Sequence, residues 1–104
     1  MGKDEYCIDP LAPVFDALGK KWALFIIAVL GNKRTVRFGE LQRSLLDISP
    51  RTLSDRLKEL EAAGLVRRKA YAEVPLRVEY ALTSKGEALR ESLLPMLRWA
   101  EKHE

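Results

Sequence analysis

The sequence predicts a mainly α-helical domain that carries one small β-hairpin. Two features predict this class: five stretches with helical apolar spacing or helix-capping residues, and two strand-like stretches late in the chain, 66–71 and 78–82. With 104 residues, of which 47% are hydrophobic, the chain can build one apolar core but is too short for two. We therefore expect residues 1–104 to form a single domain.

The first helix is expected over residues 10–18, where four apolar residues recur with the spacing of one helix face: Leu11, Val14, Phe15 and Leu18. The second, over residues 20–30, is apolar nearly all round and is therefore expected at the centre of the core. Its run "WALFIIAVL" would span only about 14 Å against roughly 30 Å of hydrocarbon, which predicts a buried helix and no membrane partner. A short extended segment, 35–37, follows.

The third helix is short and is marked by Phe38, Leu41 and Leu45. Asp47 and Ile48 are then expected to make a tight turn into the fourth helix. This turn is short enough to hold the two helices in contact.

The fourth helix, over residues 49–63, has clear signals at both ends. Ser49 suits the N-cap and Pro50 the first helical position, while Gly64 suits the left-handed residue that ends a helix. Three leucines share one face of this helix, and three charged residues point to the opposite side: Leu53, Leu57 and Leu60 against Arg51, Asp55 and Lys58. One face is expected in the core, and the other is free to contact a partner.

The two strands are joined by the loop "AEVPLR", where Pro75 lies outside the ladder. In the second strand, alternation places Val78, Tyr80 and Leu82 inward and leaves Glu79 and Ala81 outward. The last helix is expected over residues 84–101, with Ser84 as its cap and a kink at Pro95.

The last helix carries more apolar surface than one contact requires. Leu94 and Trp99 lie outside the arc of roughly 100° that a surface helix usually buries. A second partner is therefore expected, and in so short a chain it is most simply another copy of the same protein.

The predicted order of elements, α-α-β-α-α-β-β-α, contains a helix-turn-helix followed directly by a basic hairpin. This is the arrangement of a winged helix-turn-helix, in which the second helix of the pair enters the major groove of double-stranded DNA. The recognition helix would be about 49–63 and the wing about 67–78. Residues 34–77 hold ten Arg and Lys against six Asp and Glu, whereas the rest of the chain holds eight against nine. The excess charge suits a polyanion, although a solvated charged face would give the same count.

Six residues at the start of the recognition helix are candidates to face the DNA: Ser49, Arg51, Thr52, Ser54, Asp55 and Arg56. Arg51 is the best candidate for bidentate contact with guanine. Asp55 suits an acceptor for cytosine, but it also lies four residues from Arg51, where an ion pair within the helix is expected as often. Ser49 can be a cap and nothing more.

Phosphate contacts are expected from five further cations: Arg37, Arg43, Arg68, Lys69 and Arg77. The cations of the first strand have an alternative role, since charge on an exposed strand keeps a sheet edge soluble. Arg77 has two alternatives, which are insertion into a minor groove and coverage of the hairpin by its aliphatic stem.

Enzymatic readings find little support, and no cofactor or metal is expected. The chain has one histidine, His103, and one cysteine, so it offers no metal cluster and no nucleophile with a positioned base. It also has neither a phosphate-binding loop nor a G-x-G-x-x-G motif. A single cysteine and the lack of a secretory signal lead us to expect a cytoplasmic protein.

Four stretches resemble the HxlR family of winged-helix transcriptional regulators: "GKKWALFIIAVL", "RFGEL", "ISPRTLSDRL" and "EVPLRVEYALT". The resemblance runs from about Cys7 to Trp99. It implies a homodimer joined through the first and last helices, with two recognition helices on a palindromic operator whose half-sites lie about 34 Å apart. The interface would include Leu11, Phe15, Leu93, Leu94, Leu97 and Trp99.

The resemblance also makes Cys7 a candidate redox sensor, since some family members respond to oxidants or electrophiles through a cysteine near the N-terminus. Here Cys7 is followed by Ile8, Asp9 and Pro10, whereas the family often has proline directly after the cysteine. The acidic neighbours disfavour a thiolate, and the alternative is a small packing residue. A redox or small-molecule effector is therefore a possible partner. The rival to DNA binding is a winged-helix protein-interaction module whose basic wing meets an acidic protein surface.

Overall fold

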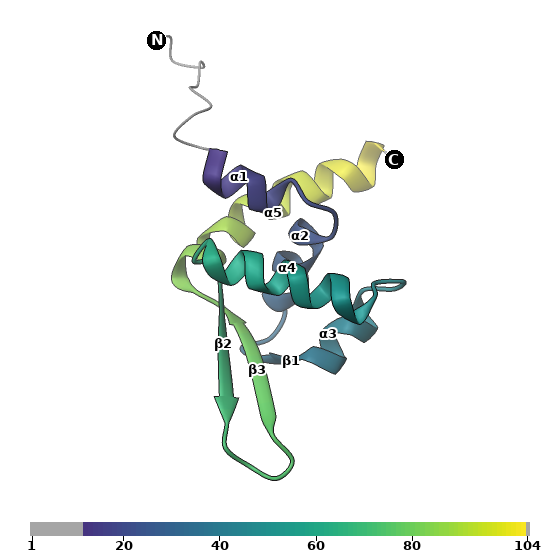
Figure 1. The fold of residues 1–104 in the computed structure, drawn as a ribbon. Helices are drawn as coiled ribbons and strands as arrows, with labels where there is room; N and C mark the ends of the chain where they lie inside the picture. The colour runs from purple at the N-terminus through teal and green to yellow at the C-terminus, as the bar shows by residue number, and fades with distance from the viewer. Residues whose placement is uncertain (1–11, 104) are drawn as a thin grey trace.

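The computed structural model describes residues 12–103 and has the predicted architecture, a mainly helical winged-helix domain with a small antiparallel sheet (Figure 1). The elements in chain order are α1 (Ala12–Leu18), α2 (Ala23–Leu30), β1 (Val36–Arg37), α3 (Phe38–Ser44), α4 (Pro50–Ala62), β2 (Val66–Tyr71), β3 (Arg77–Leu82) and α5 (Ser84–His103). None of the described helices is long and apolar enough to cross a membrane.

The hairpin of β2 and β3 projects from a body of helices, and α4 lies across that body between two ends of the molecule (Figure 1). At one end are α1 and the C-terminal part of α5, and at the other is the loop that joins β2 to β3. The sheet has the order β1-β3-β2, so β3 is the central strand and β2 an edge. β1 pairs with β3 through Val36 and Tyr80, a pairing that the sequence did not indicate.

The core lies where α2, α4 and the sheet meet. The three leucines predicted on the inner face of α4, Leu53, Leu57 and Leu60, are 0–1% exposed, and Ile26 and Ile27 of α2 are fully buried. Full burial of a leucine contributes about 1.5–3 kcal/mol relative to an exposed one, so this face seats α4 firmly in the domain.

Two helix starts differ from the predictions. The second helix begins at Ala23, three residues late, because Trp22 adopts a left-handed conformation with φ 79° that a continuing helix does not allow. Ser84 is the first helical residue of α5, so it is not the cap. Thr83 caps α5 instead, since its Oγ1 accepts the N–H of Gly86 at 3.1 Å.

The prediction that Ala81 faces outward was wrong, since it is 4% exposed. It lies on the central strand, which has β1 and β2 on its two edges and contacts α2, α3 and α5, so both faces of its last residues are covered. The last helix continues through Pro95 to His103, two residues beyond its predicted end.

Candidate nucleic-acid interface

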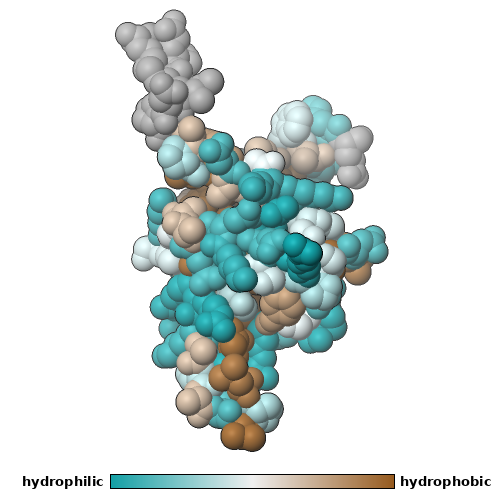
Figure 2. All heavy atoms as spheres, viewed as in Figure 1, coloured by the Kyte–Doolittle hydropathy of each residue, from teal (hydrophilic) through white to brown (hydrophobic). Residues whose placement is uncertain are grey.

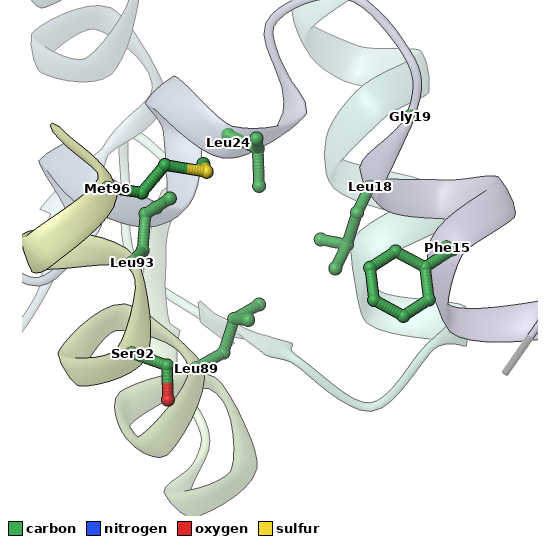
Figure 3. Close-up of a pocket in the computed structure, with 8 residues that line it drawn as sticks. All are labelled: Phe15, Leu18, Gly19, Leu24, Leu89, Ser92, Leu93 and Met96. Atoms are coloured by element: carbon green, nitrogen blue, oxygen red, sulfur yellow. The ribbon is translucent and has the colours of Figure 1, made fainter. Parts of the chain in front are cut away.

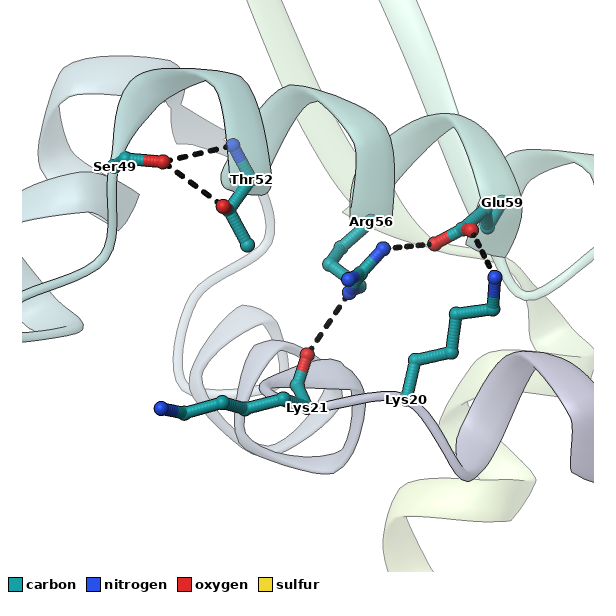
Figure 4. A network of polar contacts seen from close by, with 6 residues as sticks. All are labelled: Lys20, Lys21, Ser49, Thr52, Arg56 and Glu59. Carbon is teal, nitrogen blue, oxygen red and sulfur yellow. Dashed lines mark hydrogen bonds and ion pairs between the residues drawn. The ribbon is translucent and has the colours of Figure 1, made fainter.

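The N-terminal end of α4 is capped as its sequence predicts. Ser49 Oγ accepts the N–H of Thr52 at 3.1 Å and donates to Thr52 Oγ1 at 2.9 Å, while Pro50 occupies the first helical position (Figure 4). The Ser49 hydroxyl is therefore engaged within the helix both as a hydrogen-bond donor and as an acceptor. Thr52 is the better placed of the two to donate outward, because its own hydroxyl proton is bonded to no residue within 12–103.

The turns at the two ends of α4 fix its direction. Asp47 has φ 71°, and the chain then buries Ile48 before the helix begins. At the other end Gly64 has φ 78°, its N–H donates to the Glu61 carbonyl at 2.9 Å, and the N–H of Leu65 donates to the Leu60 carbonyl at 3.0 Å. This is a Schellman turn, and it directs the chain straight into β2.

Arg51 is the most available cation at this end of the helix. Both Arg51 and Asp55 are exposed, and within residues 12–103 neither forms an ion pair, so the predicted alternative of a pair between them is not found. Thr52 and Ser54 are half-buried beside them. The free amides of a helix N-terminus add a preference for phosphate.

Two of the predicted phosphate contacts flank α3, and both are exposed: Arg37 before the helix and Arg43 in its last turn. The N–H of Arg37 donates to Glu40 Oε1 at 3.3 Å, and Lys33 Nζ lies 3.1 Å from Glu40 Oε2. The hydrogen bond from Lys33, helped by the Arg37 amide, lowers the pKa of Glu40 below its ordinary value. Glu40 thus stays charged and holds the start of α3, which leaves the Arg37 side chain outside the cap.

The wing places its cations on both faces of β2. Arg67 and Lys69 share one face and line a shallow depression with Tyr71 and Glu79, whereas Arg68 belongs to the other face. All three cations are exposed, and Lys69 Nζ lies 5.1 Å from the centre of the Tyr71 ring. Because β2 is an edge strand, their alternative role in protecting that edge stays open.

Arg77 is held inside the hairpin. Its guanidinium lies 4.0 Å from the centre of the Tyr71 ring, and its Nε lies 3.3 Å from Glu73 Oε2. A second carboxylate oxygen, Glu79 Oε2, lies 4.0 Å from Arg77 Nη1. This geometry favours the predicted alternative in which Arg77 covers the hairpin.

The tip of the wing is apolar, a feature for which the sequence pattern predicts no role. Val74 is fully exposed and Leu76 is 65% exposed, and hydrophobic side chains gather at this end of the molecule (Figure 2). Hydrophilic residues cover much of the helical body seen in the same view. The tip therefore offers a contact surface of a different kind from the cationic strand that leads to it.

Arg56 points away from the free end of α4. Its Nε donates to the Lys21 carbonyl at 3.0 Å, and its Nη1 lies 2.7 Å from Glu59 Oε1 (Figure 4). Lys20 Nζ completes the group at 2.9 Å from Glu59 Oε2. The hydrogen bond from Lys20, with a further one from Arg56, lowers the pKa of Glu59. The roles of Lys20 and Lys21 could not be predicted, because partners 35 or more residues apart leave no local signal. Glu59 was missed although it lies three residues from Arg56, a spacing at which helix side chains meet.

A groove of about 380 Å³ lies between α1, α2 and α5, with Leu18 and Phe15 facing Leu24 and Met96 across it (Figure 3). Phe15 is 59% exposed and Met96 is 48% exposed. Of the predicted interface residues, Trp99 is 61% exposed and Leu94 and Leu97 are half-buried, whereas Leu93 is buried in the core of its own chain. Leu11 and Cys7 lie outside the described residues.

Within residues 12–103, no three His, Cys, Asp or Glu side chains are grouped so that they could hold a metal ion.

Comparison with known proteins identifies close relatives over nearly the whole chain. A family model described as HxlR-like helix-turn-helix matches residues 17–104. An uncharacterised HTH-type transcriptional regulator of Halalkalibacterium halodurans is 42% identical over 95 residues, which cover 91% of this chain and 84% of that protein. The uncharacterised HTH-type transcriptional regulator YvaP of Bacillus subtilis is 41% identical over 100 residues, 96% of this chain and 91% of the relative.

Solved structures agree with these matches. A possible HxlR family transcriptional factor from Thermoplasma volcanium superposes with a TM-score of 0.82 at 41% identity, covering 97% of this chain and 90% of that one. The reduced form of the transcriptional regulator YodB from B. subtilis gives a TM-score of 0.78 at 38% identity and covers 94% of each chain. The redox regulator HypR in its oxidised form gives a TM-score of 0.80 at 36% identity, and the match covers 89% of this chain and 95% of the HypR chain.

Proposed function

This chain belongs to the HxlR-like helix-turn-helix family of transcriptional regulators, which are not enzymes, and we propose that it binds a palindromic operator as a homodimer. In this proposal residues 1–104 form a single DNA-binding domain. α4 enters the major groove, and the wing lies on the backbone or in the minor groove.

The observation that carries the proposal is the N-terminal end of α4. Arg51 projects from the first turn of a helix whose inner face is fully buried and whose cap is complete, and no carboxylate among the described residues pairs with it. A guanidinium on so rigid a support suits bidentate contact with guanine. Thr52, Ser54 and Asp55 lie beside it for further base or phosphate contacts.

The remaining cations suit phosphate. Arg37, Arg43, Arg68 and Lys69 are exposed on three different elements around α4, a distribution that suits contact with the backbone on either side of a groove. Arg77 is the weakest of the predicted contacts, because Glu73 and Glu79 already neutralise it.

The proposed homodimer rests on the apolar surface at the other end of the molecule. Phe15, Met96 and Trp99 are each about half exposed or more on α1 and α5, and large exposed apolar side chains of this kind mark interaction sites. Since this surface lies at the opposite end from the wing, a second copy bound there would leave both recognition helices free (Figure 1). A twofold dimer then requires a palindromic site with half-sites about 34 Å apart.

The experiment that tests the proposal is selection of bound DNA from a random pool, followed by titration with salt. We expect enrichment of one palindrome, binding that weakens steeply as salt rises, and a dimer in sedimentation at micromolar concentration. A monomer that enriches no sequence would contradict the proposal.

A second function from a different class is favoured by the apolar tip of the wing. Exposed Val74 and Leu76 suit contact with another protein, with the cations of β2 facing an acidic surface. In that case the protein would be a winged-helix interaction module without sequence preference. The same selection separates the two, because such a module gives no enriched palindrome.

We also propose that Cys7 is a candidate redox sensor for this regulator. The support comes from relatives, since HypR is described as a redox regulator and YodB has been solved in a reduced and in a diamide-treated form. Selection with reduced and with oxidised protein is the test, with Cys7→Ser as the matched control. Equal binding by both forms would contradict a sensing role.

A further inference from the structure

We infer that Arg56, with Glu59 and Lys20, is a positioning group that fixes how the recognition helix is presented relative to α1 and α2, and that Arg56 is not itself a DNA contact. The inference rests on the proposed function, in which α4 reads the operator. It assigns a role to contacts that join segments 35 residues apart in the chain.

The first support is the direction of the Arg56 side chain. Its Nε and Nη1 are both engaged, one with the Lys21 carbonyl and the other with Glu59, and only 21% of the side chain is exposed (Figure 4). A guanidinium held by a carbonyl and neutralised by a carboxylate has little attraction left for a phosphate. Arg51, one turn earlier, has neither restraint.

The second support is the segment that Arg56 holds. The Lys21 carbonyl belongs to the peptide that precedes Trp22, whose φ of 79° is rare for a bulky side chain. Such a conformation persists only when its surroundings enforce it. Trp22 packs against the core on one side, and the bond from Arg56 fixes the peptide on the other.

The third support is where this segment leads. Leu18 and Gly19, directly before it, line the groove between α1 and α5, and Lys20 reaches across to Glu59 on α4. α1 also packs against α4. A displacement of α1, which lies in the proposed dimer interface, would therefore be transmitted to the recognition helix through two polar contacts, Arg56 with the Lys21 carbonyl and Lys20 with Glu59.

Arg56→Lys is the decisive variant. Arg51→Lys, on the same helix, is its control in the exchange measurement only, because Arg51 is itself proposed to contact a base. Lysine keeps the charge but cannot make both contacts of the guanidinium. We expect Arg56→Lys to lower the ratio of cognate to scrambled affinity by about five- to tenfold. We also expect Arg56→Ala to leave the salt dependence unchanged, whereas loss of one phosphate contact would reduce the log-log slope by about 0.9.

Amide hydrogen exchange in free protein supplies a readout that does not need DNA. The N–H of Ala23 donates to the Lys20 carbonyl at 3.2 Å, so its protection reports on the segment that Arg56 holds. We expect Arg56→Lys to speed its exchange by roughly threefold or more relative to amides in the middle of α5, and Arg51→Lys to leave it unchanged.

Reversal of the ion pair tests the remaining contact. Lys20→Glu should lower the cognate-to-scrambled ratio, and Glu59→Lys should lower it further because it also breaks the pair with Arg56. The double variant should recover only the part carried by the pair of residues 20 and 59. The inference is overturned by a salt slope that falls with Arg56→Ala, by an unchanged ratio in Arg56→Lys, or by a double variant with no higher ratio than Glu59→Lys alone. If the wild-type chain selects no sequence, the proposed function fails, and the exchange of Ala23 then decides the positioning role alone.

Discussion

The first turn of α4 and the wing both carry arginine, but their arginines lie in different surroundings. Arg51 projects from a capped helix and meets no carboxylate among the described residues, whereas Arg77 lies over Tyr71 and close to Glu73 and Glu79. A count of cations treats the two as equal. Their neighbours distinguish them, because a paired guanidinium must give up its partner before it binds a phosphate.

The support beneath the two regions differs as well. α4 is seated by three buried leucines and closed by caps at both ends, whereas the outer half of the wing is largely exposed on β2, half-buried on β3 and ends in an apolar loop. A rigid support is needed to read base edges, since a bidentate contact tolerates little error in position. Contact with phosphate tolerates more. These differences support the proposal that α4 supplies specificity and the wing general affinity.

The largest expected effect comes from removing the support of α4. Leu57→Ala deletes a side chain that is 1% exposed, and such a change in a packed core costs about 2–5 kcal/mol of unfolding free energy. Thermal or urea unfolding followed by circular dichroism measures this cost. Lys58→Ala, at an exposed position next in the chain, is the control and should change stability by less than about 0.5 kcal/mol.

The next largest effect distinguishes base-specific contacts from sequence-independent phosphate contacts. Arg51→Ala should weaken binding to the selected palindrome by about 1–3 kcal/mol and should leave binding to scrambled DNA nearly unchanged. Fluorescence anisotropy on both DNAs measures the difference. Equal losses on the two would show that Arg51 contacts phosphate, and the division of roles between α4 and the wing would then fail.

The sequence predicted α4 well because its signals are local. Ser49, Pro50 and Gly64 act within one turn of the helix end, and all three have the expected roles in the structure. The first turn of α5 was misread, since Thr83 and Ser84 are both good caps and only tertiary packing selects between them. Thr83 donates to the Gly64 carbonyl at 2.6 Å, and Gly86 lies so close to the Leu65 carbonyl that no side chain fits there.

The same distinction between local signals and tertiary contacts explains which parts of the candidate site could be predicted. The free end of α4 could be predicted from helix periodicity alone, because the direction of Arg51 depends only on its place in the helix. The attachment of Arg56 to Lys21 depends on a partner in another element, and the stacking of Arg77 on Tyr71 depends on a partner across the hairpin. Periodicity carries no information about such pairs. Arg56 was therefore grouped with the free cations, and for Arg77 coverage of the hairpin was only one of two alternatives.

A smaller effect is expected on the wing. Lys69→Ala removes an exposed cation of β2 and should weaken cognate and scrambled DNA by the same factor, with a log-log salt slope lower by about 0.9. Titration of both DNAs at several salt concentrations measures the slope. A loss confined to the cognate site would mean that the wing also reads sequence.

The smallest expected effect tests whether ion pairing with Glu73 keeps Arg77 from contacting DNA. Glu73→Gln removes the nearer carboxylate, whose Oε2 lies 3.3 Å from the Arg77 Nε, while it keeps the size of the side chain. An exposed ion pair of this kind contributes about 0–1 kcal/mol, so the fold should be unaffected.

If the pairing withholds Arg77 from DNA, Glu73→Gln should tighten binding to any sequence and raise the log-log salt slope by less than the value for one phosphate contact. The double variant Glu73→Gln/Arg77→Ala should lose that gain. If it keeps the gain, the change reflects only the loss of a negative charge near the DNA, and the contrast between a free Arg51 and a bound Arg77 has no functional consequence.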